Sequence, residues 1–376
     1  MKKIIERIQT IRNSKKIIRD MRGEINNEIS LEAESIPFLN KPGIIFTFDD
    51  GFRIRHWYDY GIGKKSNYND LFGYFDVKAT FNINAYHLFE NQRELTQSEI
   101  DMLLELQANG HEIAHHGYKH RNSVEYTRTY GLNSWIEDDI SLLIEWMAKQ
   151  KHSISGDQFK CPVSFAFPGS KYNEETCEAI VTRFFKIARG YLKQDNLISM
   201  QHTGFSPSVC IDENVFPNIK LLKPALFYAK ETGRNLVLMG HSILPKNINW
   251  DNYGWGEGSK EAGKYRISPE NIEYIINEAK KIGLEFYTMA EAAGIATFID
   301  HRLEGAIREQ LNIKEKWIYI KDLLKIKELN LEGKGISNLA GIEYLTNLEK
   351  LNIINNKNLN NMKLLNKLKR IKKLEM

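Results

Sequence analysis

Residues 43–51 read GIIFTFDDG and join an uninterrupted apolar run to two adjacent carboxylates and a glycine. The apolar run has the length and the β-branched and aromatic content of a buried strand. An isolated aspartate pair is usually a turn or a helix cap. Two aspartates where a buried strand ends, however, bring two like charges together, which is costly unless a cation or a shared proton relieves the repulsion. The segment therefore predicts a buried strand that ends at a charged site.

Apolar runs and amphipathic stretches alternate along the chain from this segment onward. The apolar runs predict strands at 43–48, 77–83, 111–114, 163–167, 185–188, 235–239 and 285–288. The stretches between them predict helices at 96–109, 135–150, 174–182, 217–232 and 269–282. Strands that alternate with helices over about 250 residues indicate an α/β protein with a mostly parallel sheet, either a barrel or a doubly wound sheet.

Length and composition are those of a globular protein with room for more than one domain. The 376 residues are 42% hydrophobic and 27% charged. No run of eighteen apolar residues occurs, so the sequence predicts no membrane-spanning helix. The basic N-terminus is not followed by the apolar stretch of a secretion signal. We therefore expect a cytoplasmic location, with a cell-surface location left open if another route exports the protein.

Charge and cysteine usage argue against several classes of protein. The formal net charge is +4, but residues 1–22 and 357–376 each carry +6, which leaves −8 for the middle of the chain. An acidic middle argues against a nucleic-acid groove through the main domain. The three cysteines form no CxxC pair, which argues against a disulfide framework and a zinc ribbon.

Residues 1–40 are predicted to be a basic amphipathic helix followed by a linker. The isoleucines of this segment recur at helical spacing among lysines and arginines between residues 3 and 22. Such a helix can lie on an anionic membrane surface or dock on its own protein. Docking is the favoured prediction, because the helix lacks the tryptophan or phenylalanine that anchors many interfacial helices.

The C-terminal stretch repeats its leucines at a fixed period. Leu329, Leu351 and Leu374 are separated by 22 and 23 residues. This period, with an L-x-L pattern and asparagine-rich turns, is typical of leucine-rich repeats. A leucine-rich amphipathic helix is the alternative, but glycines and an asparagine pair interrupt it. An array of so few repeats cannot bury a core alone. Residues 323–376 should therefore pack on the preceding domain or bind a protein partner. Residues 299–322 are predicted to be a connecting helix.

Four of the ten histidines lie within residues 111–120. His116 and His120 are four residues apart, so one helical turn would bring both imidazoles onto one face, as divalent metal binding requires. Imidazole and carboxylate together suit zinc or a similar first-row ion. In combination with the aspartate pair, the histidines predict a metal site.

Several short motifs together resemble the NodB-like polysaccharide deacetylases, over about residues 41–295. These motifs are Thr47-Phe48-Asp49-Asp50-Gly51, Lys78-Ala79-Thr80-Phe81, His116-Gly117-Tyr118-Lys119-His120, Ser164 to Ser170, Lys186 to Gly190, Met239 to Ser242 and Phe286 to Glu291. The resemblance implies a catalytic domain at residues 41–298 with a distorted (β/α) barrel. Its site would lie at the carboxyl ends of the strands.

The resemblance also implies a set of metal ligands. Asp50, His116 and His120 would bind one divalent metal ion, with Zn²⁺ favoured and Co²⁺, Ni²⁺ or Mn²⁺ as alternatives. Asp49 would be the general base that takes a proton from the attacking water.

Further residues are implied around the substrate. His241 would be the general acid that protonates the departing amine. A backbone N–H in the Pro168-Gly169 turn would stabilise the oxyanion. Tyr253 and Trp255 lie in a glycine-rich loop and would either offer aromatic faces to sugar rings or pack back on the core.

The chain departs from the family pattern at two places. The arginine that commonly steadies the base aspartate is replaced by Ala166. We hypothesise that Arg189, in the fourth motif region, supplies this guanidinium instead. The usual tryptophan-containing fourth motif is not evident, which leaves the partner of His241 unidentified.

The function implied by the resemblance is a metal-dependent hydrolase that removes N-acetyl groups from an amino-sugar polymer, oligosaccharide or glycoconjugate. The same machinery would serve an O-acetyl esterase or another amidase. A catalytically weak binding scaffold that acts through the leucine-rich repeats is the alternative from a different class. The intact aspartate pair and histidines argue against it, because a scaffold needs no adjacent uncompensated carboxylates.

Overall fold

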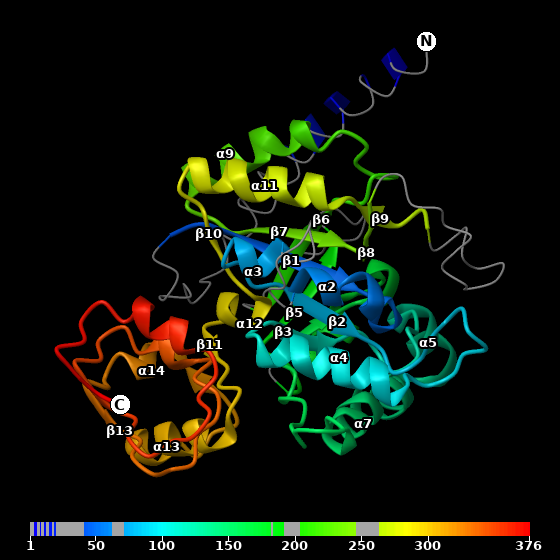
Figure 1. Cartoon of the computed structure of the whole chain (residues 1–376). Helices are drawn as coiled ribbons and strands as arrows, with labels where there is room; N and C mark the ends of the chain where they lie inside the picture. Colours follow the sequence, from blue (N-terminus) through cyan, green and yellow to red (C-terminus); the bar gives the residue numbers. More distant parts are fainter. Residues whose placement is uncertain are drawn as a thin grey trace.

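The structure is a computed structural model that describes residues 41–61, 71–181, 183–191, 204–245 and 263–376. It also describes part of a helix near the N-terminus, at Ile4, Ile5, Ile8, Ile11, Arg12, Lys15, Lys16 and Arg19. Figure 1 shows a barrel surrounded by helices and, beside it, a smaller C-terminal unit.

The barrel is built from parallel strands that follow one another in chain order (Figure 1). These strands are β1 (Gly43–Asp49), β2 (Thr80–Ile83), β3 (Glu112–His115), β4 (Ser164–Ala166), β5 (Ile187–Tyr191), β6 (Phe205–Cys210) and β7 (Leu236–Gly240). β1 pairs with β2 through Thr47 and with β7 through Ile45, which closes the ring. β10 (Glu285–Phe286) pairs with the first residues of β1. The predicted α/β barrel is therefore confirmed.

β1 is buried along its whole length. A strand of a closed parallel barrel has one face toward the barrel interior and the other toward the surrounding helices, so both faces need apolar side chains. Phe46 and Phe48 lie on one face and Ile45 on the other, and the ring of Phe48 stacks on Phe81 of β2 with centroids 5.8 Å apart. This explains why the apolar run before the aspartates does not alternate with polar residues.

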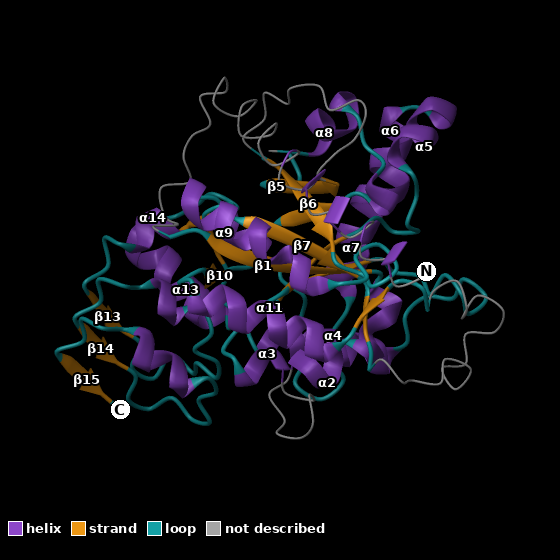
Figure 2. Cartoon of the chain, turned by 90° about the horizontal axis from the view of Figure 1, so that it is seen from above, coloured by secondary structure: helices purple, strands orange, loops and turns teal. Residues whose placement is uncertain are grey.

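Helices cover the outside of the barrel, and Figure 2 shows them around the central strands. The longer ones are α4 (Gln97–Ala108), α5 (Ser123–Tyr130), α7 (Leu142–Lys149), α8 (Glu174–Ile180), α9 (Lys223–Thr232) and α11 (Pro269–Lys281). Shorter elements are η1 (Gly51–His56), α2 (Tyr58–Gly61), α3 (Leu71–Tyr74), α6 (Leu132–Trp135), η2 (Ile136–Ser141), η3 (Pro168–Ser170), η4 (Ile219–Leu222), α12 (Met289–Ala292) and the paired strands β8 (Ser242–Ile243) and β9 (Arg266–Ile267).

One barrel strand, β6, is absent from the sequence-based prediction. Its residues Phe205–Cys210 include Pro207 and serines, and proline is unfavourable within a central strand because it cannot donate a backbone hydrogen bond. β6 is nevertheless held between β5 and β7. The single helix predicted at 135–150 is also wrong in detail, since a π-helical turn at η2 joins α6 to α7.

The C-terminal unit is a stack of short parallel strands. They are β13 (Glu328–Asn330), β14 (Lys350–Asn352) and β15 (Lys373–Glu375), separated by the 3-10 turns η6 (Ile342–Tyr344) and η7 (Met362–Lys367). Leu329 pairs with Leu351, and Leu351 pairs with Leu374, so the leucine period of the sequence is the register of this sheet. The unit also contains α13 (His301–Leu311), α14 (Ile320–Leu323) and the antiparallel pair β11 (Ile295–Ala296) and β12 (Ile318–Tyr319). α13 shares one hydrophobic core with the repeats.

The repeats pack against the barrel near the amino ends of its strands. Asn338 and Asn361, from successive repeats, both donate through Nδ2 to the carbonyl oxygen of Ala108 at the end of α4, each at 3.0 Å. Lys78, just before β2, forms a partly buried ion pair with Glu343. This contact places the repeats at the opposite end of the barrel from the carboxyl ends of the strands.

The N-terminal helix does not show the predicted docking on its own protein in the residues that are described. Ile4 and Ile5 are 64% and 56% exposed, and Ile8 and Ile11 are also exposed. Figure 1 shows this helix projecting away from the barrel. Among the described residues, no helix is long and apolar enough to cross a membrane.

The repeat stack predicts a difference between two leucines at equivalent positions. Leu351→Ala should lower the free energy of unfolding by about 2 to 5 kcal/mol, because it leaves a cavity in a packed core. Leu374→Ala should cost less than about 1 kcal/mol, since Leu374 is 38% exposed and Leu351 only 2%. Urea unfolding followed by circular dichroism measures both. Equal losses would contradict the packing described for the repeats.

Candidate active site

A cavity of about 500 Å³ lies at the carboxyl ends of the barrel strands. Its walls come from the ends of β1, β5, β6 and β7 and from the loops that follow β3 and β4. The lining residues are Asp49, Asp50, Arg53, Leu88, Phe89, His116, His120, Gly169, Ser170, Tyr191, Cys210, Val215, Met239, His241 and Tyr265. The cavity therefore combines the predicted ionisable residues with an apolar wall.

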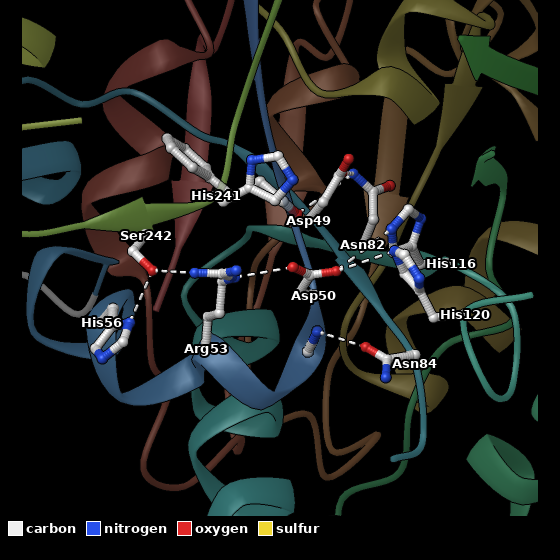
Figure 3. A network of polar contacts seen from close by, with 12 residues as sticks. Asp49, Asp50, Arg53, His56, Asn82, Asn84, His116, His120, His241 and Ser242 are labelled. Atoms are coloured by element: carbon white, nitrogen blue, oxygen red, sulfur yellow. Dashed lines mark hydrogen bonds and ion pairs between the residues drawn. The ribbon is translucent and has the colours of Figure 1, made fainter. Parts of the chain in front are cut away.

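Asp50 directs one carboxylate oxygen at two imidazoles (Figure 3). Its Oδ1 lies 3.7 Å from Nε2 of His116 and 3.4 Å from Nε2 of His120. Ligand atoms of the three residues lie within 4.8 Å of one another. Oδ1 is buried and has no hydrogen-bond partner among the described residues, although an unpaired buried carboxylate oxygen is costly. A divalent cation held by one carboxylate and two imidazoles fits this arrangement.

The backbone around Asp50 is shaped to present its side chain to the cavity. Asp50 has a positive φ of 75°, in the left-handed region that few non-glycine residues adopt. The next amide, Gly51 N–H, donates to Oδ1 of Asn84 at 2.9 Å, which fixes the turn after β1. Strain of this kind is tolerated where the surrounding structure determines the conformation.

The two histidines come together through a loop and not through the helical turn predicted from their spacing. Gly117 has φ +76° and His120 has φ +56°, both outside the helical region. The ring centroids of His116 and His120 are nonetheless 4.9 Å apart. Nδ1 of His116 lies 2.8 Å from the carbonyl oxygen of Ala166, to which it can only donate. Nε2 of His116 therefore keeps its lone pair facing Asp50.

Asp139, on the π-helical turn η2, holds this histidine loop from beneath. Its Oδ1 accepts the Lys119 N–H at 3.0 Å, and its carbonyl oxygen accepts the Tyr118 N–H at 3.1 Å. A Cβ at residue 117 would lie 2.4 Å from Oδ2 of Asp139, so the loop requires Gly117. Burial raises the pKa of Asp139 to about 7. The sequence analysis did not identify this residue, because a carboxylate inside an amphipathic helix pattern normally faces solvent.

Asp49 is held by a guanidinium and an amide. Nη2 of Arg189 lies 2.6 Å and 2.5 Å from the two carboxylate oxygens, and Nδ2 of Asn82 donates to Oδ1 at 2.9 Å. Burial alone would raise the pKa of Asp49, but the charges of Arg189, His116 and His241 together hold the pKa below its ordinary value. Arg189 on β5 is the register partner of Ala166 on β4. Arg189 thus reaches Asp49 from the strand next to the one that carries Ala166.

His241 is paired with Asp212, a residue that the sequence analysis missed. Nδ1 of His241 lies 2.6 Å from Oδ2 of Asp212, and the His241 N–H donates to Oδ1 at 3.1 Å. Burial would lower the pKa of His241, but the charge and hydrogen bond of Asp212, together with the charge of Asp50, raise the pKa above its ordinary value. Asp212 comes two residues after β6. Because β6 was not recognised as a strand, nothing in the sequence indicated that Asp212 reaches the site.

The residues predicted to contact the substrate differ in where they lie relative to the cavity. Gly169 lines the cavity and has φ +57°, whereas Pro168 is buried beside it and is not among the lining residues. Tyr253 and Trp255 lie outside the described residues.

Comparisons with known proteins agree with the resemblance seen in the motifs. Residues 39–183 match the family model described as polysaccharide deacetylase. This part of the chain is therefore similar to polysaccharide deacetylases, and it contains the aspartate pair and both histidines of the site. A search of curated proteins finds no match.

Several solved structures are similar to parts of this chain. The catalytic domain of a peptidoglycan N-acetylglucosamine deacetylase from Eubacterium rectale is 16% identical over 66% of this chain and 89% of that one, with a TM-score of 0.36. A polysaccharide deacetylase from Bacillus cereus is 14% identical over 66% and 92%, with a TM-score of 0.35. An internalin from Listeria monocytogenes is 31% identical over 21% of this chain and 24% of its own, with a TM-score of 0.20.

The geometry around Asp49 predicts separate effects on turnover and on metal binding. Arg189→Ala should reduce turnover by about a hundredfold, because the carboxylate loses the group that orients it. Co²⁺ affinity should change by less than about tenfold, since Arg189 donates to Asp49 and not to the three candidate ligands. Steady-state kinetics and Co²⁺ titration measure the two effects. Arg183→Ala, at an exposed turn outside the cavity, is the control. Wild-type turnover in Arg189→Ala would refute the orienting role.

Proposed function

We propose that this chain is a metal-dependent deacetylase that removes N-acetyl groups from an amino-sugar polymer, oligosaccharide or glycoconjugate. The observation that carries the proposal is the arrangement of the cavity. A buried, unpaired oxygen of Asp50 faces two imidazoles, while an oriented carboxylate and a histidine–aspartate pair lie in the same cavity. The match of residues 39–183 to polysaccharide deacetylases supports the same reaction class.

Asp50, His116 and His120 are the proposed metal ligands. A divalent ion at this position would lower the pKa of a water molecule and polarise the acyl oxygen of the substrate. Two imidazoles and one carboxylate favour Zn²⁺, with Co²⁺, Ni²⁺ and Mn²⁺ as alternatives. Burial lowers the pKa of His116 to about 4, so its imidazole is neutral and able to act as a ligand at pH 7.

Asp49 is the proposed general base. Its lowered pKa keeps it ionised, and the hydrogen bonds from Arg189 and Asn82 fix the direction of its carboxylate. A base that is already oriented loses little entropy when it accepts the proton of the attacking water.

His241 is the proposed general acid. Asp212 binds Nδ1, which leaves Nε2 to carry the proton that the departing nitrogen needs. The raised pKa of His241 keeps the imidazole protonated over a wider pH range. An amine is a poor leaving group unless it is protonated, so this group suits an amide substrate.

The substrate would bind along the cavity wall. The backbone N–H of Gly169 is the proposed donor to the oxyanion, and Phe89 and Tyr265 offer aromatic faces that suit the apolar face of a sugar ring. Tyr253 and Trp255 are proposed to extend this surface.

The first experiment is acetate release from N-acetylglucosamine oligomers, O-acetylated glycans and acetylated sugar nucleotides, with Zn²⁺-loaded and Co²⁺-loaded protein. We expect release from N-acetylated substrates and a loss of about a hundredfold or more in Asp49→Asn. Release confined to O-acetylated glycans would indicate an esterase. No release from any substrate, in protein that binds no metal, would overturn the proposal and favour a binding scaffold.

The pairing of His241 with Asp212 predicts a shift in the pH profile. Activity should fall at high pH as the general acid loses its proton. Asp212→Asn removes the charge that raises the pKa of His241, so the high-pH limb of kcat/KM should move to lower pH by about one unit. Glu213→Gln, one residue further along, is a control outside the cavity lining. An unchanged limb in Asp212→Asn would contradict the role given to His241.

A further inference from the structure

Arg53 contacts the second oxygen of the proposed metal ligand Asp50. Its Nε donates to Oδ2 at 2.9 Å, while Oδ1 faces the two histidines (Figure 3). The side chains of Arg53 and Asp50 are only 3% and 7% exposed. A charge-assisted hydrogen bond in a buried setting is shorter and stronger than a neutral one, so it restricts rotation of the carboxylate. Asp50 is therefore held with one oxygen turned toward the candidate metal position.

The same guanidinium reaches the strand segment that follows His241. Nη1 of Arg53 donates to Oγ of Ser242 at 2.7 Å, and Nδ1 of His56 lies 2.9 Å from the same Oγ. A guanidinium can only donate, so Oγ accepts from Arg53 and its hydroxyl proton can point to His56. Burial, with the charge of Arg53, lowers the pKa of His56 to about 3, so its imidazole is neutral. The hydroxyl of Ser242 thus links Arg53 to His56.

A second contact from the same short segment reaches His241 itself. Nε1 of Trp57 donates to the carbonyl oxygen of His241 at 2.7 Å. Trp57 and Arg53 lie directly after the turn that carries Asp50. They therefore hold residues 241 and 242 at two points. Both sides of the cavity, the metal-binding side and the proton-donating side, are connected through residues 53–57.

We propose that Arg53 is a positioning residue for this site. It offers a single oxygen of Asp50 to the metal ion and fixes the distance between Asp50 and the segment that bears His241. This inference rests on the proposed metal-dependent function, because Asp50 is a ligand only in that proposal. It goes beyond that function by giving a positioning role to a residue outside the proposed set of metal ligands and proton donors.

Arg53→Lys separates positioning from charge. Lysine keeps the positive charge but lacks the planar fork that donates to Asp50 and Ser242 together. If Arg53 positions Asp50, the Kd for Co²⁺ should rise by about 10- to 100-fold, as found when partners of metal ligands are changed. The visible absorption of the Co²⁺ complex should also change, because it depends on how the ligands are arranged. A wild-type Kd and spectrum in Arg53→Lys would overturn the proposal.

Ser242→Ala tests the other end of the connection without altering Asp50 or the charge of the site. It should raise the Kd for Co²⁺ in the same direction by a smaller factor, and it decides the question if Arg53→Lys does not fold. Ser164→Ala is the matched control, since Ser164 is equally buried but donates to Glu112, before the carboxyl ends of the strands. We expect no change of Kd in this control. No effect in Ser242→Ala, or an equal effect in Ser164→Ala, would overturn the inference.

Neither the Kd for Co²⁺ nor the absorption spectrum requires a substrate. Failure of the positioning role can therefore be distinguished from failure of the proposed function. Protein that binds Co²⁺ and responds to Arg53→Lys, yet releases acetate from no glycan, would refute the deacetylase proposal and leave the positioning role standing. Acetate release with no response of Co²⁺ binding to Arg53→Lys would refute only the positioning role. Wild-type protein that binds no Co²⁺ would refute both.

Discussion

The site depends on the presence of two neighbouring carboxylates at the buried end of one strand. Asp49 and Asp50 would repel each other and lose hydration unless each charge were compensated. Each has its own arginine: Arg189 binds both oxygens of Asp49, and Arg53 binds one oxygen of Asp50. The pKa values of both carboxyl groups lie below their ordinary values despite burial. Of their four carboxylate oxygens, only Oδ1 of Asp50 has no hydrogen-bond partner among the described residues, and it faces the two histidines.

Closure of the barrel brings the other groups to this pair. β1 lies between β2 and β7, so residues near the carboxyl ends of three strands meet around Asp49 and Asp50: Asn82 from β2, His241 after β7, and the aspartates themselves. Because neighbouring parallel strands end at the same rim, side chains far apart in the chain converge there. The repeats pack at the opposite end, through Lys78 and Ala108, which precede β2 and β3. Their packing therefore leaves the cavity uncovered.

Support beneath the site comes from irregular backbone. The π-helical turn η2 carries Asp139 into the interior, where it holds the loop between His116 and His120. The left-handed conformations of Asp50 and His120 turn their side chains toward each other. Such conformations persist because the surrounding hydrogen bonds determine them. The three candidate metal ligands thus lie on irregular backbone that buried polar contacts hold in place.

Local patterns in the sequence were sufficient for an α/β protein with a parallel sheet, for most strands and helices, and for the aspartate pair with its two histidines, whereas the barrel itself was implied by the family resemblance. These features depend on residues close together in the chain: an apolar run, a capping signal, a short spacing between histidines. The spacing of the leucines likewise matches the register of β13, β14 and β15, in which successive leucines pair with one another. Three features could come only from the tertiary structure. His116 and His120 meet through a loop held by Asp139, Asp212 reaches His241 from beyond a strand that carries a proline, and Arg53 joins Asp50 to Ser242. Each depends on groups brought together by barrel closure or by a backbone turn. Contacts between residues 20 to 189 positions apart leave no periodic pattern in a single sequence.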